Sequence, residues 1–121
     1  KQGLSNVLIL GDGSMCKVLV DVLGDRDLNY NILSRKKENL HTVKNIILAE
    51  KLSQLLVINT CARKYVFDGP TDLKYHFWDM NYELEHHQAY FENSKVLYQD
   101  GLLQLKLQAK YALKCWNLIS F

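Results

Sequence analysis

Two glycines near the start of the chain have the spacing of a phosphate-binding turn. Gly11 and Gly13 are followed by Cys16, so small residues occupy the first, third and sixth positions of the segment. In such a turn the first glycine permits a tight bend and the second lets a pyrophosphate approach the backbone, while a small sixth residue lets the next helix pack closely on the preceding strand. The N–H groups that begin the helix then face the phosphates. The spacing predicts a dinucleotide site; the alternative is an ordinary strand-to-helix turn.

A basic cluster about 20 residues further on bears on which dinucleotide would bind. An acidic residue at this distance typically bonds the ribose 2′-hydroxyl of NAD, whereas an arginine accommodates the 2′-phosphate of NADP. The chain has Ser34, Arg35, Lys36 and Lys37 there, with no carboxylate among them. The Arg35 guanidinium can pair with a phosphate or lie against adenine. We therefore interpret the cluster as NADP-binding; the alternative is a solvated basic turn before the next helix.

Strands that alternate with helices are needed to position these groups. The apolar run 7–10 predicts a buried strand, and the segment after it has one apolar helical face that ends at Gly24 and consists of Met15, Val18, Leu19, Val22 and Leu23. Further strands are predicted at 30–33, 45–48, 55–58, 75–78 and 95–98, and helices at 38–43, 49–53, 83–91 and from 102 onward. The alternation predicts one domain over residues 1–121, an α/β Rossmann-like doubly wound fold with a mainly parallel sheet and helices on both faces.

The last predicted helix carries apolar residues at intervals of three and four, which is typical of a core-facing stripe. The stripe consists of Leu102, Leu105, Ala109, Ala112, Trp116 and Ile119.

Composition and patterning argue against several classes of protein. The formal net charge of +2 is too small to indicate a nucleic-acid partner, and no apolar run approaches the ~20 residues of a membrane span. No signal peptide is recognisable, so a cytoplasmic protein is expected. Three separated cysteines predict neither a disulfide nor a zinc site, and the adjacent His86 and His87 cannot easily face one metal ion.

The residues of the chain offer little catalytic equipment. Cys61 follows a predicted strand, but no histidine or aspartate partner can be placed beside it, so we interpret it as a small packing residue. There is no Ser-His-Asp pattern. The chain begins at Lys1 with the first strand close behind, which favours a fragment of a longer protein. We expect no catalytic residue and no metal ligand within it.

Several segments, in the right order, resemble the shikimate dehydrogenase family. Near the end, Asp79-Met80-Asn81-Tyr82 resembles the family's Asp-x-x-Tyr segment, and the stretch from Asp100-Gly101 through Gln108-Ala109 to Trp116 resembles its final helix. Upstream, the segments that resemble the family's glycine loop, its Asn-Arg-Thr segment and its Ile-Asn-Ala-Thr segment are Ile9-Leu10-Gly11-x-Gly13, Ser34-Arg35-Lys36 and Ile58-Asn59-Thr60-Cys61.

The resemblance implies NADP(H) as cofactor and a small molecule of the shikimate type as substrate. It places the pyrophosphate at the turn of Gly11, Asp12, Gly13, Ser14 and Met15, where the charge of Asp12 excludes that side chain as a phosphate ligand. It places the 2′-phosphate at Ser34, Arg35 and Lys36, the nicotinamide at Asn59, Thr60, Cys61 and Gly101, and the substrate at Tyr82 and Gln108.

The family's catalytic lysine and aspartate belong to an amino-terminal domain that is absent from these 121 residues. The resemblance therefore implies a partner domain that performs the proton chemistry. A rival interpretation is a non-catalytic nucleotide-binding or regulatory module with the same fold. It is favoured by Cys61-Ala62 in place of the family's Thr-Pro and by the segment Glu83-Leu84-Glu85-His86, which lacks its Asn-Pro.

Overall fold

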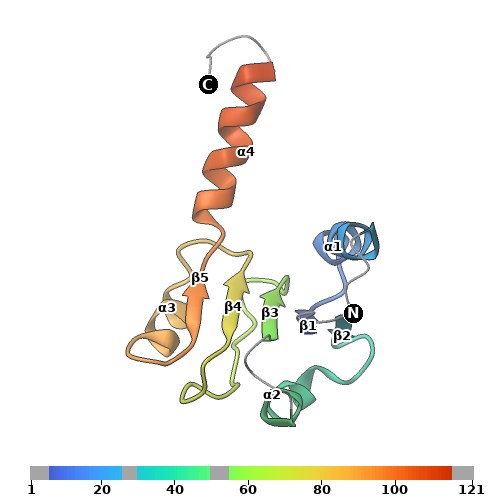
Figure 1. Ribbon diagram of the computed structural model, residues 1–121, viewed down its shortest axis with the longest axis vertical. Coiled ribbons are helices and arrows are strands. Elements are labelled where there is room, and N and C mark those ends of the chain that lie inside the picture. The colour runs from blue at the N-terminus through green and yellow to red at the C-terminus, as the bar shows by residue number, and fades with distance from the viewer. Residues whose placement is uncertain (1–5, 26–29, 50–54, 116–121) are drawn as a thin grey trace.

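The described part of the chain folds as a five-stranded parallel sheet with helices on both faces (Figure 1). The computed structural model describes residues 6–25, 30–49 and 55–115. In chain order the elements are β1 (Asn6–Leu10), α1 (Ser14–Asp25), β2 (Tyr30–Leu33), a short 3₁₀ helix (Leu40–Thr42), α2 (Val43–Ala49), β3 (Leu55–Asn59), β4 (His76–Asp79), α3 (Glu85–Phe91), β5 (Leu97–Gln99) and α4 (Leu102–Cys115).

The strands lie in the order β2-β1-β3-β4-β5, and each neighbouring pair is parallel. The predicted α/β fold with a parallel sheet is therefore confirmed. The chain runs from β1 outward to β2 and then returns to the other side of β1 as β3. At this reversal the loops that follow β1 and β3 diverge, which is where open α/β sheets bind ligands.

The sheet separates two apolar clusters because successive side chains of a strand point to opposite faces. Leu8 and Leu10 of β1 belong to one cluster, and Val7 and Ile9 belong to the other. Helices α2 and α3 cover the first face with Val43, Ile47 and Phe91, whereas α1 covers the second with Cys16 and Leu23. Both faces of β1 and β3 are thus buried, as their unbroken apolar runs predict.

Three local predictions were wrong. The predicted strand at 45–48 is part of α2, because Val43 and Ile47, four residues apart, bury one helical face. The predicted helix at 38–43 is a 3₁₀ turn that leads into α2, and residues 50–53 lie outside the described part of the chain. Helix α1 runs through Gly24 to Asp25, and its buried face is turned from the predicted one, so that three predicted core residues are exposed: Met15, Val18 and Val22.

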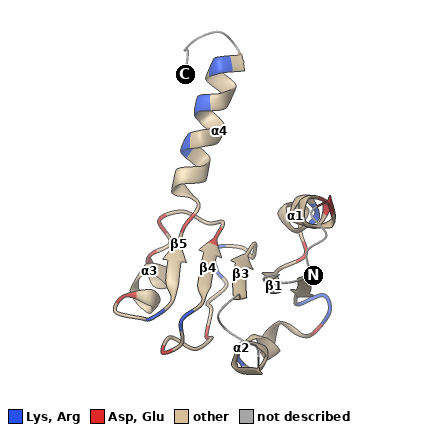
Figure 2. Cartoon of the chain, viewed as in Figure 1, with Lys and Arg blue, Asp and Glu red and all other residues tan. Residues whose placement is uncertain are grey.

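The predicted core-facing stripe of α4 was also wrong. The helix leaves the sheet at the end of β5 and projects away from it (Figure 1), and none of its described residues is buried. Leu105 is 43% exposed, Leu107 56% and Tyr111 64%. Its charged residues are lysines, which follow one another along the helix in Figure 2. Trp116 and Ile119 lie outside the described residues.

Candidate functional site

A pocket of about 520 Å³ lies at the carboxyl edge of the sheet, where the loops after β1, β2 and β3 meet. It brings together eight of the predicted cofactor-binding residues from three separate segments. Glycine-turn residues, basic-cluster residues and residues after β3 line it together: Gly11, Asp12, Gly13, Ser34, Arg35, Lys36, Thr60 and Cys61. Its volume is within the range of about 300–1,000 Å³ that is usual for small-molecule sites.

The two positions of the turn suit glycine for different structural reasons. Gly11 has φ +101°, and a Cβ there would come within 2.6 Å of Thr60 Oγ1. Thr60 is tied to the same place, because its N–H and its hydroxyl both donate to the Leu10 carbonyl, at 2.8 and 2.7 Å. A Cβ at Gly13 would meet nothing within 4 Å. Gly11 therefore seats the turn against the β3 loop, and Gly13 leaves the backbone open to a ligand.

The basic cluster lies in a turn whose shape is fixed by Asn39. The Ser34 N–H donates to Asn39 Oδ1 at 2.9 Å, and the Ser34 hydroxyl accepts from the Lys37 N–H at 3.1 Å. Ser34 is buried, and its N–H and its hydroxyl oxygen both form hydrogen bonds within the turn. Arg35 and Lys36 are exposed at the pocket. Asn39 was not singled out from the sequence, although an asparagine at the end of a basic turn is a common turn-former.

The electrostatics of the pocket keep Cys61 from acting as a nucleophile. Burial raises the pKa of the Cys61 thiol to about 11, and the opposing effect of the Arg35 charge is smaller. The thiol is thus protonated at neutral pH, when a thiolate is what nucleophilic chemistry requires. Three cationic side chains, Arg35, Lys36 and Lys64, line the pocket together with Asp12, so its charge favours an anionic ligand.

Four predicted cofactor-binding residues do not line this pocket. Ser14 and Met15 are exposed in the first turn of α1 beyond it. Asn59 is completely buried behind the β3 loop. Gly101 is buried at the start of α4, where a Cβ would lie 2.5 Å from the Met80 carbonyl oxygen.

The two predicted substrate residues lie on different elements. Tyr82 is 43% exposed in the loop after β4, where it lines a hollow of about 340 Å³ with Arg63. The Arg63 guanidinium lies 5.7 Å from the Tyr82 ring centroid and donates to the carbonyl oxygens of Tyr82 and Glu83, at 2.9 and 3.3 Å. Gln108 is exposed on α4, between its second and third turns, and lines neither this hollow nor the pocket.

Sequence reasoning missed four further residues of the pocket lining: Leu40, Ala62, Lys64 and Tyr65. The last three lie within four residues after Cys61, beyond the carboxyl end of a buried parallel strand, so Lys64-Tyr65 was a usable signal. A second hollow of about 500 Å³ lies next to the pocket, because Arg35, Leu40 and Tyr65 line both.

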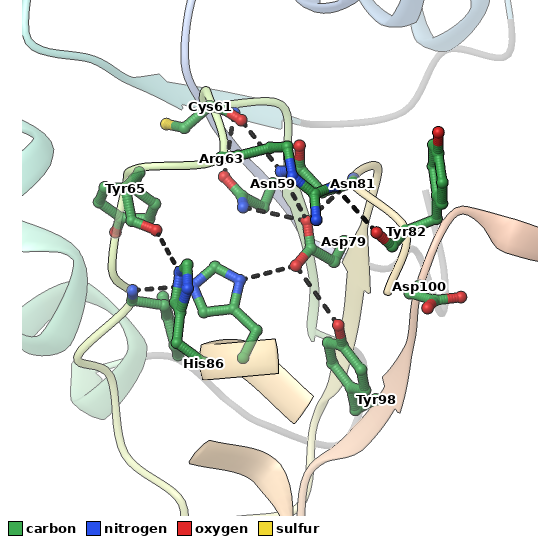
Figure 3. A network of polar contacts seen from close by, with 12 residues as sticks. Asn59, Cys61, Arg63, Tyr65, Asp79, Asn81, Tyr82, His86, Tyr98 and Asp100 are labelled. Carbon is green, nitrogen blue, oxygen red and sulfur yellow. Dashed lines mark hydrogen bonds and ion pairs between the residues drawn. The ribbon is translucent and has the colours of Figure 1, made fainter. Parts of the chain in front are cut away.

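A buried polar network lies directly behind the β3 loop (Figure 3). Its centre is the fully buried carboxylate of Asp79, which accepts hydrogen bonds from Asn59, Asn81, His87 and Tyr98. Burial alone would raise the pKa of Asp79, but the hydrogen bonds from His87 and Asn81 outweigh it and hold the pKa below its usual value. The carboxylate is therefore charged at neutral pH. No sequence pattern pointed to this network.

Other kinds of site find no support in the described part of the chain. No group of three histidine, cysteine or acidic residues there is arranged to hold a metal ion. The cysteines, Cys16, Cys61 and Cys115, are free thiols. Among the helices of residues 6–25, 30–49 and 55–115, none is long and apolar enough to cross a membrane.

Comparisons of the chain with protein-family models, with curated proteins and with solved structures find no match.

Proposed function

We propose that the chain is the NADP-binding domain of an oxidoreductase similar to shikimate dehydrogenases. The observation that carries the proposal is the meeting of the Gly11–Gly13 turn with Arg35 and Lys36 around one pocket at the β1/β3 reversal of the sheet. Phosphate-binding backbone and cations for a further phosphate are the two things that distinguish an NADP site from other small-molecule pockets.

The pocket fits such a ligand on three further counts. The open space over Gly13 is where a pyrophosphate would approach the backbone. The cations next to it suit a 2′-phosphate, which Arg35 can bind through its planar fork. Arg35 and Tyr65 also line the second hollow, so the surface next to the pocket is hollowed on the side of these two residues.

In the whole enzyme the bound NADPH would supply a hydride for the reduction of 3-dehydroshikimate to shikimate, and the catalytic residues would come from an amino-terminal domain. This chain would bind the cofactor and contribute Tyr82 and Gln108 to the substrate side. Such an enzyme belongs to cytoplasmic aromatic amino acid biosynthesis. The chain by itself would be inactive.

The second candidate is a non-catalytic nucleotide-binding module. It is favoured by the arrangement of Arg63, whose guanidinium covers the Tyr82 ring and binds the carbonyl groups beside it. A substrate that needed Tyr82 would have to accommodate this cation. In the module, the pocket would serve a regulatory nucleotide and the hollow beside Tyr82 would have no substrate.

The test is calorimetric titration of the chain with NADPH and with NADH at one fixed salt concentration. We expect NADPH to bind more tightly than NADH, and Arg35→Ala to remove most of that preference, because only NADPH carries the 2′-phosphate. The matched control is Lys74→Ala, which removes an exposed cation just before β4, at the opposite edge of the sheet. It should leave both affinities unchanged.

Equal affinities for the two dinucleotides, or a preference that persists in Arg35→Ala, would remove the NADP assignment. Binding of NADPH without activity, when the chain is joined to an amino-terminal domain of a shikimate dehydrogenase, would favour the module over the enzyme.

A further inference from the structure

The segment from Thr60 to Phe67, called the pocket wall below, has no regular secondary structure and yet is fixed at several backbone groups. Its first fixed point is Cys61. The Cys61 N–H donates to Asn59 Oδ1 at 3.0 Å, and the Cys61 carbonyl accepts from Asn81 Nδ2 at 3.1 Å. Both polar groups of one pocket-lining residue are therefore held by asparagine side chains.

Both asparagine amides are oriented by one oxygen of Asp79. Asp79 Oδ1 accepts from Asn59 Nδ2 at 3.2 Å and from Asn81 Nδ2 at 3.1 Å. It also accepts from the Asn81 backbone N–H at 3.1 Å. Because the nitrogen of the Asn59 amide faces the carboxylate, its oxygen faces the Cys61 N–H, which is the orientation that the pocket wall requires.

The other oxygen of Asp79 acts on the far end of the pocket wall through His87. His87 is completely buried in α3, and its Nδ1–H donates to Asp79 Oδ2 at 2.6 Å. This bond assigns the proton to Nδ1, so Nε2 is free to accept from the Phe67 N–H at 3.0 Å. The neighbouring His86 reaches the same segment, since its Nε2 donates to the Tyr65 carbonyl at 2.9 Å.

We propose that Asp79 is a positioning residue for the ligand pocket, which it does not line. It sets the two asparagine amides and the His87 tautomer, and these set the backbone of the pocket wall at Cys61 and at Phe67. The proposal that this placement tunes NADPH affinity rests on the proposed function, whereas the placement itself does not. Figure 3 shows the carboxylate between the asparagine side and the Tyr98 side of the network.

The test is Asp79→Asn, which keeps the size of the side chain and replaces one acceptor by a donor. If the new nitrogen faces Asn59 and Asn81, donors oppose donors, and the two asparagine amides no longer hold the Cys61 N–H and carbonyl. If it faces His87, the imidazole must accept at Nδ1 and carry its proton on Nε2, and the Phe67 N–H then loses its acceptor. Either orientation frees one end of the pocket wall.

The primary readout is amide hydrogen exchange of the 121-residue chain, resolved residue by residue by NMR, with no ligand added. We expect exchange at Cys61, at Phe67 or at both to be at least tenfold faster in Asp79→Asn, relative to the amides of β1 in the same sample. Taking the ratio to β1 removes the effect of a general loss of stability, which accelerates exchange throughout the protein.

Two variants serve as controls. Tyr98→Phe removes the longest hydrogen bond to Asp79, at 3.4 Å, and keeps the ring, so the exchange ratios should change less than twofold. Leu23→Ala truncates a buried side chain near the far end of α1, on the other face of the sheet, and should destabilise the protein without changing the ratios at Cys61 and Phe67.

The second readout is NADPH affinity by calorimetry, which should be at least tenfold weaker in Asp79→Asn than in Leu23→Ala. Unchanged exchange ratios in Asp79→Asn overturn the positioning role. Faster exchange with unchanged NADPH affinity overturns the link between wall and ligand. If the unsubstituted chain binds no NADPH but Asp79→Asn still accelerates exchange, the proposed function fails and the positioning role stands.

Discussion

Two segments leave the same edge of the sheet and are held in opposite ways. The pocket wall, residues 60–67, has no helix or strand, yet hydrogen bonds from three neighbouring elements fix its backbone at Cys61, Tyr65 and Phe67. Helix α4 has a regular backbone over 14 residues and buries none of them. Regular secondary structure and tertiary anchoring are therefore separate properties, because the hydrogen bonds of a helix are local whereas those of the pocket wall reach across the fold.

The largest effect on stability is expected for Asp79→Ala, which removes the centre of the network that fixes the pocket wall. The substitution leaves the side-chain donors of Asn59, Asn81 and His87 without their acceptor, and Asn59 and His87 are completely buried. A buried donor left unpaired costs about 1–3 kcal/mol, so the two together should lower the free energy of unfolding by about 2–6 kcal/mol. Urea denaturation followed by circular dichroism measures it. Asp72→Ala, at an exposed aspartate, should change the stability by less than about 0.5 kcal/mol. Equal effects at both positions would mean that the network does not hold the fold.

A smaller effect is expected where the glycine turn meets the pocket wall. Gly11→Ala places a methyl group against Thr60 at a positive φ and should cost about 1–3 kcal/mol in the free energy of unfolding. Gly13→Ala meets open space and should leave stability within about 0.5 kcal/mol.

The glycine pair also separates folding from binding. If the proposed function holds, Gly13→Ala weakens NADPH binding measured by calorimetry, because its methyl group lies where the pyrophosphate would approach. A Gly13→Ala protein with full affinity and a Gly11→Ala protein with full stability would together refute this division of roles.

Protonation of Asp79 at low pH should lower the free energy of unfolding by less than the substitution Asp79→Ala does. The folded pKa of Asp79 is lowered, so its contribution to stability is complete above the unfolded value of about 3.9 and is lost as pH falls below it towards the folded value. The loss should be smaller than in Asp79→Ala, because a protonated carboxyl group still has an oxygen that accepts hydrogen bonds. The measurement is the free energy of unfolding between pH 6 and pH 3 in the unsubstituted chain and in Asp79→Asn; parallel curves for the two proteins would contradict it.

The smallest effect is expected on α4. Leu107→Ser replaces a side chain that is 56% exposed and should change the free energy of unfolding of the chain by no more than about 0.5 kcal/mol. Val57→Ala, in the fully buried middle of β3, should cost several times more and serves as the comparison in the same urea experiment. A large loss of stability in Leu107→Ser would show that α4 is anchored after all.

The elements could be predicted from the sequence where local pattern and tertiary environment agree. The apolar runs 7–10 and 55–58 correctly predicted β1 and β3, and the predicted strand at 30–33 matches β2. The run at 45–48 did not distinguish strand from helix, because three consecutive apolar residues suit both. In the structure the segment is helical, and Val43 and Ile47, four residues apart, are its buried residues. The stripe on α4 has helical spacing, but spacing cannot tell whether anything lies opposite the apolar face.

Part of the candidate site could likewise be predicted from the sequence, and part could not. The glycine turn, the basic cluster and the strand end at Thr60 could be placed on one edge, because the carboxyl ends of parallel strands meet there. The pairing of Asp79 with His87 joins a strand end to a helix and depends on how α3 packs on the sheet. A sequence carries no periodic signal for such a pair. His86 and His87 were considered for metal binding, whereas in the structure both contact the pocket wall.

The direction of α4 is set by a few contacts at its first residues. Asp100 accepts from the Glu83 N–H with one carboxylate oxygen and from the Leu102 N–H with the other, while Gly101 lies against the Met80 carbonyl. These contacts, next to Tyr82, set the direction of a helix about 21 Å long. A tilt of about 10° at the start of the helix would displace its far end by roughly 4 Å, so the position of Cys115 depends closely on the geometry of the loop after β4.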